Sequence, residues 1–225
     1  MKKAVIQLSG GLDTTTVLAI AAKEMDEVYC ISFDYGQRNI LELECAKSNA
    51  KKYKNVKEHL IFKIDLGQIG GSALTDNIDV PKDESSNPGI PITYVPARNT
   101  IFNSIALGYA EKVRANFIYN GVNNMDYSGY PDCRPEYMES FQKMANLATS
   151  YADSEQTLTY ITPLINLKKS EIIKIGLELG VDYADSLSCY DPDTQGRACG
   201  HCDACTFRLE GFAANKITDP AKYAA

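Results

Sequence analysis

The strongest candidate for chemistry is a short run of small and hydroxyl residues near the N-terminus, Ser9-Gly10-Gly11-Leu12-Asp13-Thr14-Thr15-Thr16. It follows an apolar run at 4–8 and precedes apolar residues at helical spacing, which places it between a buried strand and a helix. Two adjacent glycines permit a tight turn, and the N–H groups at a helix start favour an anion. Ser9, Thr14 and Thr15 add hydroxyl donors. The loop therefore predicts a phosphate or pyrophosphate site, against the simpler alternative that it only turns the chain and that Thr14 caps the helix.

The composition of this loop also indicates which phosphate chemistry to expect. It lacks the lysine of the G-x-x-x-x-G-K-[ST] loop, with which many ATPases and kinases hold the terminal phosphates. Transfer of the terminal phosphoryl group is therefore not the natural function. Binding of pyrophosphate as a leaving group is the better prediction.

The second candidate is a cysteine cluster, Cys189, Cys199, Cys202 and Cys205, with nine, two and two residues between its members. Two consecutive C-x-x-C steps and one cysteine from a preceding loop can enclose a tetrahedral metal, as in structural zinc sites. An iron–sulfur cluster and a reactive redox pair are the alternatives. His201 lies inside the cluster, but four thiolates already satisfy the metal, so a surface or outer position is expected for it.

The remaining three cysteines have different surroundings. Cys30 falls in a predicted strand and Cys45 on a predicted helix, which favours small core residues. Cys133 follows the carboxyl end of a predicted strand, where open α/β sheets bind ligands. We expect Cys133 to pack or to line a substrate pocket, since no base for a nucleophilic thiol can be assigned from the sequence.

Composition excludes several classes of protein. The chain has 225 residues and a net charge of −6, with 23 Lys+Arg against 29 Asp+Glu. This balance argues against broad binding to a nucleic-acid backbone and favours small-molecule substrates. No stretch of about 18 apolar residues and no signal-peptide core is present. A cytoplasmic location follows, where cysteines bind metals more often than they form disulfides.

The elements that must position these residues alternate between strand and helix. Such alternation predicts an α/β fold, a Rossmann-like, doubly wound parallel sheet. We expect a nucleotide-binding α/β domain at 1–180, with a long functional or mobile loop at about 65–93, and a small zinc-binding appendage at 181–225. The expected strands are 4–8, 28–33, 60–64, 116–120 and 158–161. The expected helices begin near residue 12 and cover 40–53, with Asn39 as N-cap, 99–113, 135–150 and 169–179.

The loop resembles the SGGxDS signature of the PP-loop ATP pyrophosphatases, with Thr14 in place of the usual Ser. From Lys3 to about Gly211 the chain is similar to the 7-cyano-7-deazaguanine synthase (QueC) family. One departure is Ala97, where that family commonly has Gly; neither departure removes a functional group. Besides the loop and the cysteines, the similarity rests on Phe33-Asp34-Tyr35-Gly36-Gln37-Arg38, Val95-Pro96-Ala97-Arg98-Asn99, Ser128-Gly129-Tyr130-Pro131-Asp132-Cys133-Arg134, Thr162-Pro163-Leu164, Lys169-Ser170-Glu171-Ile172 and Leu187-Ser188-Cys189-Tyr190.

This resemblance implies ATP-dependent conversion of 7-carboxy-7-deazaguanine and ammonia to the nitrile preQ0, in the pathway to queuosine. A carboxylate has two oxygens and a nitrile has none, so each oxygen must leave in an activated form. By analogy with other PP-loop enzymes the activated form is an adenylate, although release of ADP and release of AMP both stay open at this point. The resemblance also implies bound zinc and magnesium and a homodimer.

The resemblance further implies roles for individual residues. Asp13, Lys169 and Arg98 are the expected catalytic residues, although a lysine at a helix start is more often solvated and any one arginine often forms a surface ion pair. Asp126 and Asp132 are expected to read the guanine-like edge or to hold Mg²⁺ with Asp13. The ATP-binding residues would be Leu8, Ser9, Gly10, Gly11, Leu12, Asp13, Thr14, Thr15, Thr16, Val17 and Leu18. The substrate-binding residues would be Tyr35, Gln37, Arg38, Asp126, Tyr130, Asp132 and Arg134, with the two tyrosines stacking on the base and the arginines clamping phosphate or carboxylate.

Two other functions share parts of this pattern. A tRNA-modifying PP-loop enzyme has the same loop, but it should also present a basic RNA-binding surface. A QueC-like nucleotide-binding or protein-conjugating protein outside the queuosine pathway would share both loop and cysteines. Detection of the nitrile product separates the synthase from both alternatives.

Overall fold

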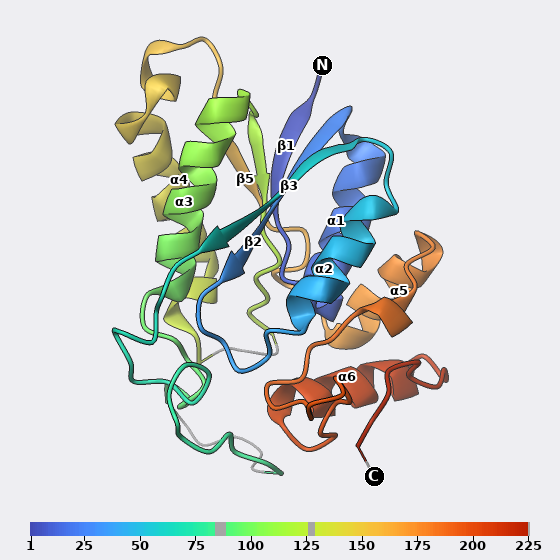
Figure 1. Cartoon of the computed structure of the whole chain (residues 1–225). Helices are drawn as coiled ribbons and strands as arrows, with labels where there is room; N and C mark the ends of the chain where they lie inside the picture. The colour runs from blue at the N-terminus through green and yellow to red at the C-terminus, as the bar shows by residue number, and fades with distance from the viewer. Residues whose placement is uncertain (84–88, 126–128, 225) are drawn as a thin grey trace.

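The computed structural model describes residues 1–83, 89–125 and 129–224 and contains a five-stranded sheet (Figure 1). All neighbouring strands pair in parallel, in the order β3-β2-β1-β4-β5. The strands are β1 (Lys3–Gln7), β2 (Glu27–Asp34), β3 (Val56–Lys63), β4 (Phe117–Tyr119) and β5 (Thr159–Ile161). The predicted parallel α/β fold is confirmed.

Helices cover both faces of this sheet (Figure 1). α1 (Leu12–Glu24), α2 (Glu42–Lys51) and α5 (Lys169–Glu178) lie on one side, and α3 (Arg98–Val113) and α4 (Pro135–Ala148) on the other. Alternate residues of β1 point to opposite sides, so that Ala4 and Ile6 join one buried cluster and Val5 the other. Because both faces of a central parallel strand are buried, its sequence is a continuous apolar run.

The order of the strands creates a topological switch point. From β1 the chain continues outward through β2 to β3, whereas β4 pairs on the opposite side of β1 and leads to β5. The loop at 8–11 leaves the carboxyl end of β1, and residues 120–123 leave that of β4. Ligands of open α/β sheets bind in the crevice between two such ends.

The C-terminal part of the chain contains a helix that the sequence interpretation missed. α6 (Asp203–Ala214) follows the cysteine motif, begins at Cys202 as its N-cap and packs against α5. With the cysteine segment it lies beneath the carboxyl edge of the sheet (Figure 1). Phe212 in its last turn is 1% exposed and belongs to the same buried cluster as residues of α1.

Two smaller expectations were wrong. α2 begins at Glu42 with Leu41 as N-cap, so Asn39 does not cap it. The Asn39 side chain instead donates to the carbonyl oxygens of Cys189 (2.9 Å) and Leu187 (3.5 Å). β3 begins at Val56, four residues before the expected start, because three consecutive polar residues, Lys57, Glu58 and His59, interrupt the apolar pattern there.

The expected long loop at about 65–93 lies in the connection between β3 and α3, whose described parts, 64–83 and 89–97, contain no helix or strand. Leu66, Ala73, Leu74 and Val95 are nevertheless buried and join the cluster around α3. This segment is therefore attached to the body by its own apolar side chains. Among the described residues, no helix is long and apolar enough to cross a membrane.

Candidate functional site

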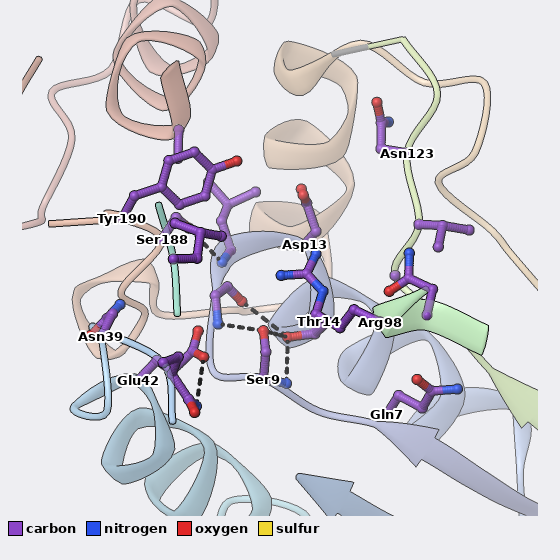
Figure 2. Close-up of a pocket in the computed structure, with 18 of the residues that line it drawn as sticks. Gln7, Ser9, Asp13, Thr14, Asn39, Glu42, Arg98, Asn123, Ser188 and Tyr190 are labelled. Carbon is purple, nitrogen blue, oxygen red and sulfur yellow. Dashed lines mark hydrogen bonds between the residues drawn. The ribbon is translucent and has the colours of Figure 1, made fainter. Parts of the chain in front are cut away.

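The loop after β1 has the form that an anion site requires. Thr14 Oγ1 accepts from the backbone N–H groups of Ser9 (3.1 Å) and Gly10 (3.3 Å) and pairs with Ser9 Oγ at 3.0 Å (Figure 2). Gly10 has φ +96°, and a Cβ there would overlap the carbonyl oxygen of Glu42. The loop is thus held tightly by its own hydroxyls and by the start of α2, and it turns into α1 at Gly11.

The Thr14 methyl group has a specific neighbour. Gly121, just after β4, lies so close that a Cβ there would be 2.8 Å from Thr14 Cγ2, whereas its next nearest atoms would be 3.5 Å away. The methyl that distinguishes Thr14 from Ser is therefore accommodated by the missing side chain at Gly121. This contact joins the two loops at the switch point.

Asp13 and Lys169 form an ion pair at the edge of the cavity. Lys169 Nζ lies 2.7 Å and 2.8 Å from the two Asp13 carboxylate oxygens. The Lys169 side chain is 8% exposed and that of Asp13 21%. Asp13 in the first turn of α1 and Lys169 at the start of α5 are 156 positions apart in the chain and thus place an anion and a cation beside the loop.

The opposite wall is aromatic and carries one guanidinium group. Arg98, the first residue of α3, donates to Tyr35 Oη at 3.3 Å and lies 5.9 Å from the centre of that ring. Phe102 stacks on Phe33 at 3.9 Å and contacts Tyr35 edge-on. Tyr130 is held by Thr93 Oγ1 at 2.8 Å. Among the described residues, Arg98 forms no ion pair with a carboxylate, which leaves its charge available to an anionic ligand.

Asp132 and Cys133 lie behind Arg98. The Asp132 carboxylate accepts from Asn99 N at 3.0 Å at the start of α3, and burial raises its pKa against the opposing effects of Asn99 and Arg98. Burial and the neighbouring Asp132 raise the pKa of Cys133 to about 12. This thiol is therefore protonated at neutral pH and lines the cavity without being an activated nucleophile.

Two polar residues near the start of α2 line the same cavity and were missed as site residues by the sequence interpretation. Burial raises the pKa of Glu42 to about 7, although a hydrogen bond from Gln37 (3.2 Å) and the charge of Arg98 act in the opposite direction. Asn39 is 7% exposed, and its Oδ1 has no hydrogen-bond partner in the part of the chain that the structure describes. Because its Nδ2 is fixed by two carbonyl oxygens, Oδ1 is an acceptor available to a ligand N–H group.

The predicted site residues divide into groups. Asp126 lies outside the described residues. Thr16, Val17 and Leu18 are buried in the core, Arg134 is exposed at the start of α4, and Gly10, Thr15 and Asp132 support the site from behind. Arg38 lines the cavity and binds Asp191 and the carbonyl oxygen of Ile78. The predicted residues that line the cavity together are Leu8, Ser9, Gly11, Leu12, Asp13, Thr14, Tyr35, Gln37, Arg38, Arg98, Tyr130 and Lys169.

The four predicted metal ligands converge. The Sγ atoms of Cys189, Cys199, Cys202 and Cys205 all lie within 4.8 Å of one another, with two pairs at 4.0 Å. Four sulfurs around zinc at the usual bond length are separated by about 3.8 Å. Backbone N–H groups point at these sulfurs, for example Cys199 N at 3.2 Å from Cys189 Sγ. The donor set and its spacing therefore fit a tetrahedral metal. No other cluster of three metal-binding side chains, Asp13 and Asp132 included, occurs in the described part of the chain.

The cysteine segment contacts the loop directly. Ser188 Oγ accepts from Leu12 N at 2.9 Å, and Leu187 N donates to Gly10 O at 3.0 Å. Arg208 of α6 is 3% exposed, binds Asp219 with two nitrogens and donates to Ser186 O. A rigid segment below the cavity thereby supports the phosphate loop.

A parallel sheet with a glycine–hydroxyl loop at its switch point defines a protein of the PP-loop class. The chain belongs to the QueC family: the model of "Queuosine biosynthesis protein QueC" matches residues 3–216.

The curated relatives are similar over nearly their whole length. A 7-cyano-7-deazaguanine synthase from Cellvibrio japonicus is 55% identical over 224 residues, which cover 99% of this chain and 98% of the relative. One from Geotalea uraniireducens is 58% identical over 223 residues, or 99% and 97% of the two chains.

Solved structures share the fold at low identity. An NMN synthetase from Francisella tularensis is 18% identical with a TM-score of 0.51, covering 96% of this chain and 77% of that one. A 4-thiouridine synthetase in a complex with RNA and bound ATP is 17% identical with a TM-score of 0.51, covering 99% and 47%.

Proposed function

We propose that this protein is an ATP-dependent enzyme that converts 7-carboxy-7-deazaguanine and ammonia to 7-cyano-7-deazaguanine, in queuosine biosynthesis. The observation that carries the proposal is the nearly full-length similarity to proteins named 7-cyano-7-deazaguanine synthase. The cavity supports it chemically, because it places a loop suited to pyrophosphate opposite a planar aromatic wall with one guanidinium group.

ATP is needed because both carboxylate oxygens must leave. In the first half, the carboxylate attacks the α-phosphate of ATP and releases pyrophosphate, and ammonia then displaces AMP to give the amide. In the second half, the amide oxygen is activated in the same way, and loss of AMP and protons gives the nitrile. The loop from Ser9 to Thr15 holds the pyrophosphate in both halves, since its N–H groups and hydroxyls are donors.

Charged residues complete this assignment. Lys169 neutralises the charge that develops on the phosphates, and Asp13 holds Lys169 in place and contacts the Mg²⁺ that enters with ATP. Arg98 binds the substrate carboxylate, and Tyr35 and Tyr130 flank the deazaguanine. Asn39 Oδ1 accepts a hydrogen bond from an N–H group of a bound base. The guanidinium group of Arg98, which has no carboxylate partner among the described residues, and the Asn39 oxygen without a donor there support these two roles.

The metal and the assembly follow from chemistry and family. We assign Zn²⁺ to the four cysteines, as a structural ion without an open position. The family implies a homodimer. We place the enzyme in the cytoplasm, and the net charge of −6 favours an enzyme that makes a free base and does not hold tRNA itself.

Mass spectrometry of the product tests the proposal. Purified protein is incubated with the carboxylate, ammonium, ATP and Mg²⁺, and the expected result is the nitrile, formed only when all components are present. Product formation is expected to stop in Asp13→Ala. Absence of the nitrile with folded, zinc-loaded wild-type protein overturns the proposal.

A further inference from the structure

Glu42 occupies a position that the phosphate loop and α2 fix together. It is the first residue of α2, and the close approach of Gly10 to its carbonyl oxygen packs this helix start directly against the loop. Its Oε1 accepts from Gln37 Nε2 at 3.2 Å. Gln37 is itself fixed, because its Oε1 accepts from Tyr35 N (2.8 Å) and its Nε2 also donates to Phe33 O (3.0 Å).

Glu42 differs from the other carboxyl group in the cavity. The described residues that line the cavity include two acids, Asp13 and Glu42. Asp13 is bound by Lys169 at 2.7 Å, whereas Glu42 forms no ion pair among the described residues. Its carboxyl group therefore keeps capacity to bind and to take up a proton.

The surroundings of Glu42 allow it to change charge near neutral pH. Burial raises its pKa to about 7, and the hydrogen bond from Gln37 and the charge of Arg98 keep the pKa from rising further. The titratable groups that face it are Arg98 of α3, Tyr35 after β2 and Cys45 on its own helix. A base with a pKa close to the working pH is the most effective in general base catalysis.

The proposed reaction needs such a base. Its nitrogen arrives as ammonium, which, like the lysine ammonium with a pKa of about 10.4, is protonated at neutral pH. Ammonium has no lone pair and cannot attack a carbonyl carbon. One proton must leave before the C–N bond forms, and a further proton must leave the nitrogen as the amide forms.

We propose that Glu42 binds the incoming ammonium ion and acts as the general base that converts it to ammonia, a role that rests on the proposed function. The Glu42 carboxylate takes one proton from NH₄⁺, and the freed lone pair of NH₃ attacks the acyl carbon of the activated carboxylate. The new C–N bond forms, the C–O bond to AMP breaks, and AMP leaves with its electron pair. Glu42 releases its proton to solvent before the surplus proton on the new amide nitrogen is lost.

The pH dependence of ammonium use tests this role in Glu42→Gln. Wild-type kcat/KM for total ammonium is expected to rise to a plateau above a pKa of about 7. In Glu42→Gln the value at neutral pH falls by about 10²- to 10⁴-fold, the usual contribution of a general base. The variant then depends on free NH₃, so its kcat/KM rises about tenfold per pH unit across the range where the wild type is level.

A matched control and a second amine separate catalysis from folding. Glu44→Gln changes an exposed glutamate of the same helix, paired with Lys47, and is expected to behave as wild type. Hydroxylamine is uncharged at neutral pH, so Glu42→Gln should use it nearly as well as the wild type does. The variant should also retain one turnover of pyrophosphate release with the carboxylate and ATP alone.

Any other result overturns the proposed role of Glu42 as the general base for ammonium. A wild-type-like ammonium profile in Glu42→Gln would show that Glu42 takes no proton. Loss of pyrophosphate release or of hydroxylamine use would show that Glu42 supports activation or folding. Absence of nitrile with the wild-type enzyme overturns the proposed function, and this role with it.

Discussion

The contact between Thr14 and Gly121 explains how the phosphate loop tolerates an extra methyl group. Thr14 contributes the hydroxyl that organises Ser9 and Gly10, and its methyl points at the only type of residue that leaves room for it. The loop after β1 and the loop after β4 are therefore constrained as a pair.

Gly121→Ala tests this constraint. The new Cβ would lie 2.8 Å from Thr14 Cγ2, so the loop must shift, and we expect ATP affinity to fall by at least about tenfold. In the double variant Gly121→Ala/Thr14→Ser the nearest atoms are 3.5 Å away, and ATP affinity should recover. Isothermal titration calorimetry measures both values. Equal affinities of the single and double variants would contradict the contact.

The ion pair between Asp13 and Lys169 should affect both activity and stability. Asp13→Ala should abolish turnover while the protein remains folded, but it removes the carboxylate that lies 2.7 Å from the ammonium of the 8% exposed Lys169. We expect the free energy of unfolding to fall by about 1–3 kcal/mol. Adding Lys169→Met should restore much of this stability without restoring activity, as urea unfolding and product assays can measure. Recovery of activity would contradict the assignment.

Glu42 affects stability in a pH window that its pKa defines. The pKa is 4.5 in the unfolded chain and about 7 in the folded protein, so the folded state binds more protons and loses stability as the pH rises from 4.5 to about 7. Glu42→Gln should therefore be more stable than the wild type at pH 8, by up to about 3 kcal/mol. The difference should vanish near pH 4. Urea unfolding at both values checks the sign, and a less stable variant at pH 8 contradicts it.

Helices and strands were predicted correctly from the sequence where the spacing of the apolar residues matches the faces that the element buries. The apolar run of β1, buried on both faces, and the helical spacing after it correctly predicted a strand, a turn and a helix at this place. β3 was recognised only in part, because the consecutive polar residues Lys57, Glu58 and His59 occupy its first half. α6 was missed because the cysteine spacing alone accounted for that segment, although Ala204 and Phe212 face the core.

The cysteine segment is also a support for the site, which yields a prediction for metal removal. Ser188 and Leu187 bind the phosphate loop from below, so loss of the metal should loosen the loop as well as the segment. Treatment with a chelator is expected to lower ATP affinity and to expose 187–205 to proteolysis. Ser188→Ala should weaken ATP binding by a smaller factor and leave the metal bound. Unchanged ATP affinity in the metal-free protein would contradict this coupling.

At the scale of the whole molecule, the site could be predicted only in part because it is assembled from distant segments. Asp13 and Lys169 are 156 positions apart, and only the packing of α1 against α5 brings them together. Glu42 carries no local signal, since an acidic residue in the first turn of a helix is ordinary. Glu42 becomes a candidate site residue only in the folded chain, where it lies between the phosphate loop and Arg98 on the opposite wall of the cavity.

The fold also explains why one cavity can serve two activation steps. The phosphate loop, Arg98 and Glu42 surround a single cavity at the switch point. In the proposed mechanism both oxygens of the substrate reach the same phosphate site, first as a carboxylate and then as an amide. This mechanism requires that each of the two oxygens leaves on AMP.

Isotope transfer from a substrate labelled with ¹⁸O in both carboxylate oxygens tests that claim most directly. After complete conversion to the nitrile, mass spectrometry of the nucleotides should find one ¹⁸O atom in each AMP, with two AMP formed per nitrile. Label in water or in inorganic phosphate, with none in AMP, would contradict activation as adenylates.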